Sequence, residues 1–216
     1  MNRLAVFAAC LVFFAAAALA SAHPSIDNSM EVVVYGDHVA IRAQISLPEI
    51  DIAHTIDDNA NARIDPAKLK KAVDAHAAYL LSHLPVTADG AAASGKVLSA
   101  TPPAEEATWA RLDQLEAVYE LEYALPKARP AKVRIEQDVL KEFSRLGQPW
   151  MVMFVVQARQ ASDKEFTQLL LSGDEPVEVA CKWDNVTATP ATSTPAITTR
   201  TTTFAVARQY LSLIHI

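Results

Sequence analysis

The densest group of potential metal ligands in the chain is the polar loop at residues 57–65. Its acidic and amide side chains have the spacing of a calcium-binding loop. The first, third, fifth and ninth ligand positions are held by Asp57, Asn59, Asn61 and Asp65. Two positions depart from that pattern, because Ala62 replaces the glycine of the sharp turn and Lys68 replaces the glutamate that closes the ligand shell. These departures favour an asparagine-rich turn that caps the following helix, with calcium binding as the alternative.

A second candidate metal ligand is His23, which becomes the first residue of the mature chain if an export signal is removed after Ala22. A free terminal amine and the ring nitrogen of the same histidine can together bind copper or nickel. Pro24 has no backbone N–H, so the other common chelate, through the next backbone nitrogens, is excluded. His38 or His54 could complete the site. The simpler interpretation, which we favour, is that His23 only follows the cleavage site.

The remaining reactive residue types form no recognisable catalytic set. His76 and His83 are separated by about 10 Å along the axis of an expected helix, so they cannot share an ion directly and are expected at the surface. Cys181 alternates with apolar residues, which favours a buried small side chain over a reactive thiol. No Ser–His–Asp, Cys–His or glycine-rich phosphate-binding pattern connects the other residues, and we expect a protein that is not an enzyme.

The net charge bears on nucleic-acid binding, and the first 22 residues indicate the compartment. The chain has 216 residues and a formal net charge of −6, which argues against nucleic-acid binding. Residues 1–22 have the three parts of a secretory signal, which are Arg3 near the start, an apolar stretch and small residues at the end. We therefore expect an exported, periplasmic protein. Cys181 would be its one cysteine, so no internal disulfide is expected.

The elements that must position these residues are mostly short alternating strands. Such segments joined by short turns predict a mainly β (α+β) fold, an antiparallel β-sandwich-like domain of about eight strands. One long inserted helix is expected at about 66–84, with Asp65 as its N-cap and Pro66 at its first position. A shorter helix is expected at 139–146. A hairpin is expected at 30–47, with Gly36 and Asp37 in a type II′ turn.

The apolar run at 150–156 is expected to be the central strand, buried on both faces, because it is too short to cross a membrane. After residue 185 the composition changes to Thr, Ala, Pro and Ser, which predicts a flexible linker. The expected division is a signal peptide at 1–22, an exported globular domain at 23–185, a linker at 186–203 and the start of a membrane region at 204–216. Residues 211–216 look like a translated library adaptor, so we expect a non-native end.

The order of these pieces resembles the exported N-terminal domain of the HupE/UreJ-like family of hydrogenase/urease accessory membrane proteins. The resemblance rests on the Ala-His-Pro that ends the signal, the hairpin around residues 35–39, the Asp/Asn loop and the sequence Phe-Ser-Arg-Leu-Gly-Gln-Pro-Trp at 143–150. It covers about residues 20–185. It implies that membrane helices follow this domain, that the full-length protein is integral to the inner membrane, and that its role is linked to nickel supply.

The first hypothesis for function is therefore a non-enzymatic periplasmic domain of a truncated HupE/UreJ-like accessory membrane protein, linked to metal supply. The alternative is a stand-alone periplasmic module that binds copper or calcium, and an exported hydrolase has the least support. The candidate ions are nickel, copper and calcium. We expect the membrane to be reached through the missing C-terminal region, and the sequence does not identify a protein partner.

Overall fold

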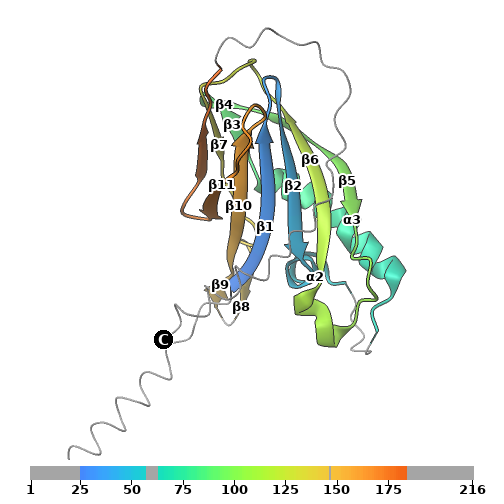
Figure 1. The fold of residues 1–216 in the computed structure, drawn as a ribbon. Coiled ribbons are helices and arrows are strands. Elements are labelled where there is room, and N and C mark those ends of the chain that lie inside the picture. The colour runs from blue at the N-terminus through green and yellow to red at the C-terminus, as the bar shows by residue number, and fades with distance from the viewer. Residues whose placement is uncertain (1–24, 57–62, 146, 184–216) are drawn as a thin grey trace, which may run out of the picture. The chain divides into compact units, whose positions relative to one another are not determined.

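The structure is a computed structural model that describes residues 25–56, 63–145 and 147–183. Nearly half of these residues lie in strands, which form several sheets with few helices between them (Figure 1). All of the described residues except Trp183 belong to one compact unit. No helix within these ranges has the length and apolar character needed to cross a membrane. The mainly β, sandwich-like α+β class expected from the sequence is confirmed.

The larger sheet has six strands in the order β11-β10-β1-β2-β6-β5 (Figure 1). The strands are β1 (Ser25–Val34), β2 (His38–Ser46), β5 (Ser94–Thr101), β6 (Glu116–Ala124), β10 (Met151–Gln160) and β11 (Thr167–Ser172). Its pairs are antiparallel except β1–β10, which is parallel and places Ile26 opposite Val152. The expectation of purely antiparallel pairing is wrong at this pair, because it joins segments far apart in the sequence that local alternation cannot connect.

Alternating burial identifies the face of this sheet that meets the core. The buried residues of β2 include Val39, Ile41, Ala43 and Ile45, and the residues between them are half-buried. In β10, Val152 and Phe154 are buried whereas Met151 is 43% exposed. The expectation that residues 150–156 are buried on both faces is therefore wrong. The run looks continuous because apolar Met151, Met153 and Val155 occupy the outer face.

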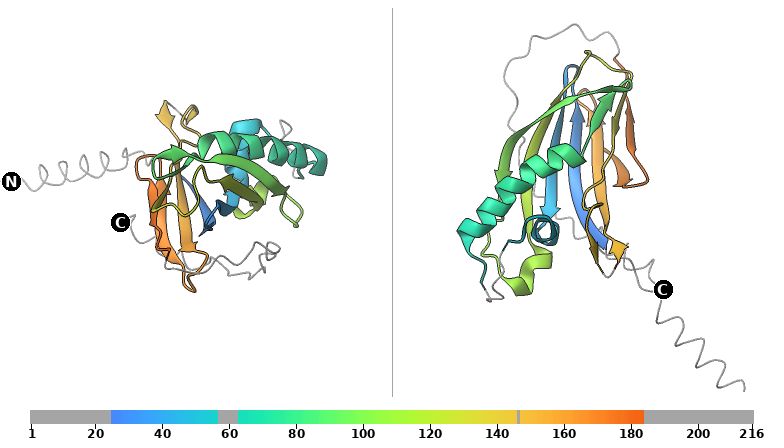
Figure 2. Two further views of the ribbon diagram at one scale, coloured as in Figure 1. Left: turned by 90° about the horizontal axis from the view of Figure 1, so that it is seen from above. Right: turned by 180° about the vertical axis from the view of Figure 1, so that it is seen from behind.

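A second layer covers the inner face of the larger sheet. The long helix α3 (Pro66–His83) crosses behind this sheet in Figure 1 and in front of it in the rear view of Figure 2. A smaller sheet has the order β12-β7-β3-β4, and β8 pairs with β9. These strands are β3 (Val86–Ala88), β4 (Ala91–Ala92), β7 (Lys132–Ile135), β8 (Ser144–Arg145), β9 (Gln148–Pro149) and β12 (Val177–Ala180).

Two tyrosine hydroxyls connect the larger sheet to the region of α3. Tyr119 donates to the carbonyl of Val73 at 3.1 Å, and Tyr123 donates to the carbonyl of Leu84 at 2.8 Å. Both tyrosines lie on the inner face of β6 and are almost fully buried. They satisfy their hydroxyl groups inside the apolar core, as buried tyrosines must.

The long helix begins where the sequence predicts. Oδ1 of Asp65 accepts from the backbone N–H of Ala67 at 2.7 Å, and Pro66 is the first helical residue. The helix ends at His83, two residues before Pro85, in agreement with the expected 66–84. A second helix, α2 (Leu47–His54), was not expected, because a proline such as Pro48, just after an alternating segment, is typical of the end of a strand. Proline fits the first turn of a helix equally well. A short 3₁₀ helix, η1 (Trp109–Gln114), precedes β6.

Two local expectations are wrong. The helix expected at 139–146 is absent, because Leu140 has a φ of 58° and residues 144–145 form β8 instead. The type II′ turn is also absent, since positive φ among the described glycines is confined to Gly90 and Gly147. The loop between β1 and β2 is closed instead by the N–H of Tyr35, which donates to the carbonyl of His38 at 2.8 Å.

Candidate functional site

Most of the metal ligands predicted from the sequence lie outside the described residues. These are His23, Asp57, Asn59 and Asn61. Asp65 is described, and its Oδ1 is hydrogen-bonded to the backbone of Ala67 as the cap of α3. That bond supports the turn-and-cap interpretation of Asp65, while calcium binding by the loop stays a prediction. Among the described residues, no group of three or more His, Cys, Asp or Glu side chains is arranged to hold a metal ion.

His38, one of the two suggested partners of His23, lies far from the start of the described chain. His38 begins β2 at the far end of the ten-residue strand β1 from Ser25. Since a strand rises about 3.3 Å per residue, His38 is about 30 Å from the point where the described chain begins. Its ring stacks on Tyr35 at 4.4 Å and its Nδ1 is 2.7 Å from Asp37. This placement removes His38 from any site formed around Ser25.

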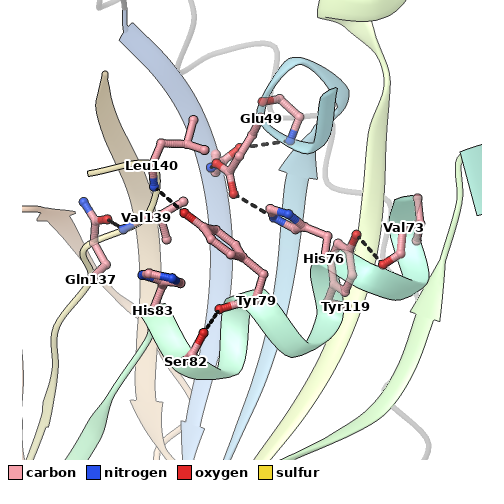
Figure 3. A network of polar contacts seen from close by, with 12 residues as sticks. Glu49, Val73, His76, Tyr79, Ser82, His83, Tyr119, Gln137, Val139 and Leu140 are labelled. Carbon is pink, nitrogen blue, oxygen red and sulfur yellow. Dashed lines mark hydrogen bonds and ion pairs between the residues drawn. The ribbon is translucent and has the colours of Figure 1, made fainter. Parts of the chain in front are cut away.

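One polar cluster in the described chain is buried and joins three elements. Nε2 of His76, on α3, lies 3.0 Å from Oε1 of Glu49, on α2. The other carboxylate oxygen of Glu49, Oε2, accepts a hydrogen bond from Nδ2 of Asn28, on β1, at 2.5 Å. Glu49 and His76 are 0% exposed and Asn28 is 4% exposed. Figure 3 shows His76 pointing from α3 toward the carboxylate of Glu49. The cluster therefore connects the sheet and both helices within the core.

The orientation of Asn28 follows from its second hydrogen bond. Its Oδ1 accepts from the backbone N–H of Ser46 at 2.9 Å, so its amide nitrogen must face Glu49. Ser46 is the N-cap of α2 and makes no side-chain cap bond of its own. Asn28 is thus hydrogen-bonded both to the backbone at the start of α2 and to the carboxylate of Glu49, one turn further along the helix. This arrangement aligns the start of the helix with the inner face of β1.

The contact with Glu49 shows which ring nitrogen of His76 acts as a donor. A carboxylate oxygen accepts, so Nε2 of His76 donates to Oε1 of Glu49. Within the described structure, Nδ1 of His76 and Nε2 of His54 are buried and have no hydrogen-bond partner. The two rings are 5.2 Å apart and nearly perpendicular. Burial, and secondly the neighbouring His76, lower the pKa of His54, so the neutral imidazole is favoured there.

Aromatic and acidic side chains continue the cluster along α3 toward the surface. Tyr79 and His83 follow His76 on one face of the helix, and the rings of Tyr79 and His83 are 4.1 Å apart (Figure 3). The hydroxyl of Tyr79 accepts from the N–H of Leu140 at 2.8 Å. Nδ1 of His83 is 2.7 Å from Oδ1 of Asp138. Burial, followed by Glu142, raises the pKa of Tyr79, so its hydroxyl stays protonated.

Cys181 is half-buried rather than fully buried. Burial raises the pKa of its thiol, and the carboxylates of Asp89 and Asp163 raise it further. A thiol must ionise to act as a nucleophile or a metal ligand. This environment therefore agrees with the expectation that Cys181 is not a reactive thiol.

The expectation that His76 lies at the surface is wrong, because its side chain is in the core. The reason is visible in the helix periodicity. The buried face of α3 consists of Leu69, Ala72, Val73, His76, Ala77 and Leu80. Spacings of three and four place His76 on this apolar stripe. Glu49 carries a weaker signal, because it lies in a short helix that was not expected and that also contains Asp51.

The cluster can do two things chemically. It can hold α2, α3 and β1 together through buried hydrogen bonds, and the buried nitrogens without a partner, Nδ1 of His76 and Nε2 of His54, could bind a group that reaches the interior. Comparison with protein-family models gives no match, and comparison with curated proteins gives no similar relative. The HupE/UreJ-like resemblance therefore stays a prediction from the sequence.

Proposed function

We propose that the chain is the non-enzymatic, exported domain of a HupE/UreJ-like accessory membrane protein. The observation that supports the non-enzymatic part of the proposal is the complete burial of this polar cluster, in which Glu49 and His76 are 0% exposed and bonded to each other. A catalytic carboxylate–histidine pair must meet a substrate, whereas this pair is enclosed by α2, α3 and the inner face of the sheet. Its role is then structural support of a domain that acts by binding.

Export and nickel supply enter the proposal from the sequence. The signal-like residues 1–22 support a periplasmic location, and the family resemblance supports a role beside metal-handling membrane helices. The domain would then present a folded surface above the membrane part and act through a protein partner or an ion. The partner is not identified by the sequence.

The experiment that tests this proposal has two measurements. Mass spectrometry of the processed protein from a periplasmic fraction should give a chain that begins at His23. Deletion of the complete gene in the source organism should lower the activity of a nickel enzyme, and added nickel should restore it. A protein retained in the cytoplasm, or unchanged nickel-enzyme activity after deletion, would contradict the proposal.

A second candidate function is ion binding by the domain itself, favoured by the two buried histidine nitrogens without partners, Nδ1 of His76 and Nε2 of His54. Calorimetric titration with copper, nickel and calcium separates the possibilities. Loss of copper or nickel binding in His23→Ala would support a site at the mature N-terminus, and loss in His54→Ala with unchanged binding in His23→Ala would support an interior site. Calcium binding that survives Asp57→Ala would exclude the loop at 57–65.

A further inference from the structure

The strand β11 forms one edge of the six-stranded sheet and has an unusual sequence for an edge. Its residues, Thr-Gln-Leu-Leu-Leu-Ser at 167–172, include no charged residue and no proline. Among the described strands, only β10 pairs with it. A strand edge presents unpaired N–H and C=O groups, and proteins usually protect such edges with charges, prolines or bulges. β11 carries none of these protections.

The other sheet edges in the described chain are protected. The opposite edge of the larger sheet, β5, has a bulge between Val97 and Ser99, and its Lys96 forms an ion pair with Glu122 at 2.8 Å. In the smaller sheet, Glu178 on the edge strand β12 is bonded to two cationic side chains of β7. The remaining edge strands of the described chain, β4, β8 and β9, have only two residues each. β11 thus differs from every other described edge.

Exposed apolar side chains occur along the same strand pair. The described residues include four exposed large hydrophobic side chains, and three of them lie at separate points of this pair: Met151 at the start of β10, Leu170 within β11 and Phe166 just before β11. Leu170 is 48% exposed and is paired with Val155 across the two strands. Arg159 covers the ring of Phe166 at 4.9 Å, at the far end of the strand pair. The centre of the edge is therefore apolar and uncharged.

Charge indicates which partner fits this edge. The chain has a formal net charge of −6, so two copies repel each other over most of their surfaces. An uncharged strand adds no local repulsion when it faces a second copy of itself. Antiparallel pairing of identical strands also satisfies the same backbone groups on both copies, as a twofold interface requires. A second copy of this chain is therefore the occupant that the edge suits best.

We propose that the protein forms a homodimer in which β11 pairs antiparallel with β11 of a second copy, so that the two six-stranded sheets become continuous. Antiparallel partners point to the same face of a sheet. With the twofold axis at Leu170, Leu170 faces its own counterpart on the outer face and Leu169 faces Leu171 on the inner face. This register buries the exposed leucine and keeps both core faces on the same side.

A charge-exchange experiment on the full-length chain tests the dimer. Analytical ultracentrifugation should give a concentration-dependent dimer for the wild-type protein. Leu170→Lys and Leu170→Glu should each weaken dimerisation at least about tenfold, because each places like charges opposite each other at the axis. An equimolar mixture of the two variants should restore a heterodimer, since opposite charges then meet. Leu98→Lys, at an exposed leucine of β5, is the matched control and should dimerise like the wild type.

A covalent test fixes the register. In a chain with Cys10 and Cys181 replaced by Ser, Leu170→Cys should form an intermolecular disulfide on mild oxidation, because opposite Cα atoms in an antiparallel pair are within disulfide reach. Leu98→Cys should not crosslink in the same background. A wild-type protein that stays monomeric at all concentrations, or a dimer that persists in both charged Leu170 variants, would overturn the proposal. Circular dichroism of each variant would confirm that the domain is folded.

Discussion

Nε2 of His76 lies 3.0 Å from Oε1 of Glu49 in the interior of the domain, although the two residues are 27 positions apart in the sequence. Both side chains are 0% exposed, and Asn28 occupies the other carboxylate oxygen. Buried polar groups are costly unless they are paired, so each member of this cluster depends on the others. The stability of the α2–α3 region should therefore respond to these residues as a unit.

The first prediction is strong coupling between Glu49 and His76. His76→Leu alone should cost about 3 kcal/mol, because it leaves a buried carboxylate without one of its donors. The double variant Glu49→Leu/His76→Leu should be less destabilised than the sum of the single variants by about 1–3 kcal/mol. Urea denaturation monitored by circular dichroism measures each free energy of unfolding.

The matched control for this cycle is His83→Leu on the same helix. Its side chain is 23% exposed and its partner Asp138 is 51% exposed, so the loss should be below about 1 kcal/mol. Additive effects of Glu49→Leu and His76→Leu would contradict the described hydrogen bond. A loss in His83→Leu as large as that in His76→Leu would contradict the importance assigned to burial.

The second prediction ranks the two buried tyrosines of β6. Tyr123→Phe should destabilise the protein by about 1–3 kcal/mol, because Leu84 follows the last residue of α3 and its carbonyl accepts no bond within the helix. Tyr119→Phe should cost only about 1 kcal/mol, because the carbonyl of Val73 lies inside the helix and keeps its backbone partner. Thermal and urea unfolding of both variants measures the difference, and the reverse order would refute this assignment.

How much of this could be predicted from the sequence depends on whether the signal is local. The start of α3 was predicted because Asp65, Pro66 and the apolar periodicity lie together in one segment. The alternation of β2 predicted its core face for the same reason. The parallel pairing of β1 with β10 and the contact between Glu49 and His76 join distant segments, and no spacing within either segment indicates them.

The buried polar cluster was not predicted for a different reason. His76 was expected at the surface, as is usual for a histidine, although it follows the apolar stripe of α3; Asn28 likewise follows the inward positions of β1. Periodicity was the better guide at both positions, since a buried polar residue is tolerated when its hydrogen bonds are satisfied. The partners that satisfy them, Glu49 and the N–H of Ser46, become visible only in the folded chain.

The third prediction concerns pH. Burial and His76 lower the pKa of His54 in the folded state below its ordinary value of 6.5, so the unfolded chain binds a proton more readily there. The contribution of His54 to stability is therefore complete at pH values above the ordinary pKa of 6.5. It is lost as the pH falls from 6.5 toward the lowered pKa of the folded state. Melting temperatures of the wild type and His54→Gln between pH 5 and 8 should show a shallower acid loss in the variant. Parallel profiles would contradict the shift.

The last prediction separates the two interpretations of the loop at 57–65. Asp65 caps α3 through the N–H of Ala67, so Asp65→Ala should cost about 1 kcal/mol of stability. Asp65→Ser should recover most of this loss, because serine also caps helices but adds no carboxylate for calcium. Chemical denaturation of the wild type and both variants, with calcium and with a chelator, makes the comparison. A pure cap predicts the same losses in both solutions, because calcium then has no site to stabilise. A loss that grows in calcium for both variants would instead make Asp65 a ligand and restore the calcium-binding interpretation of the loop.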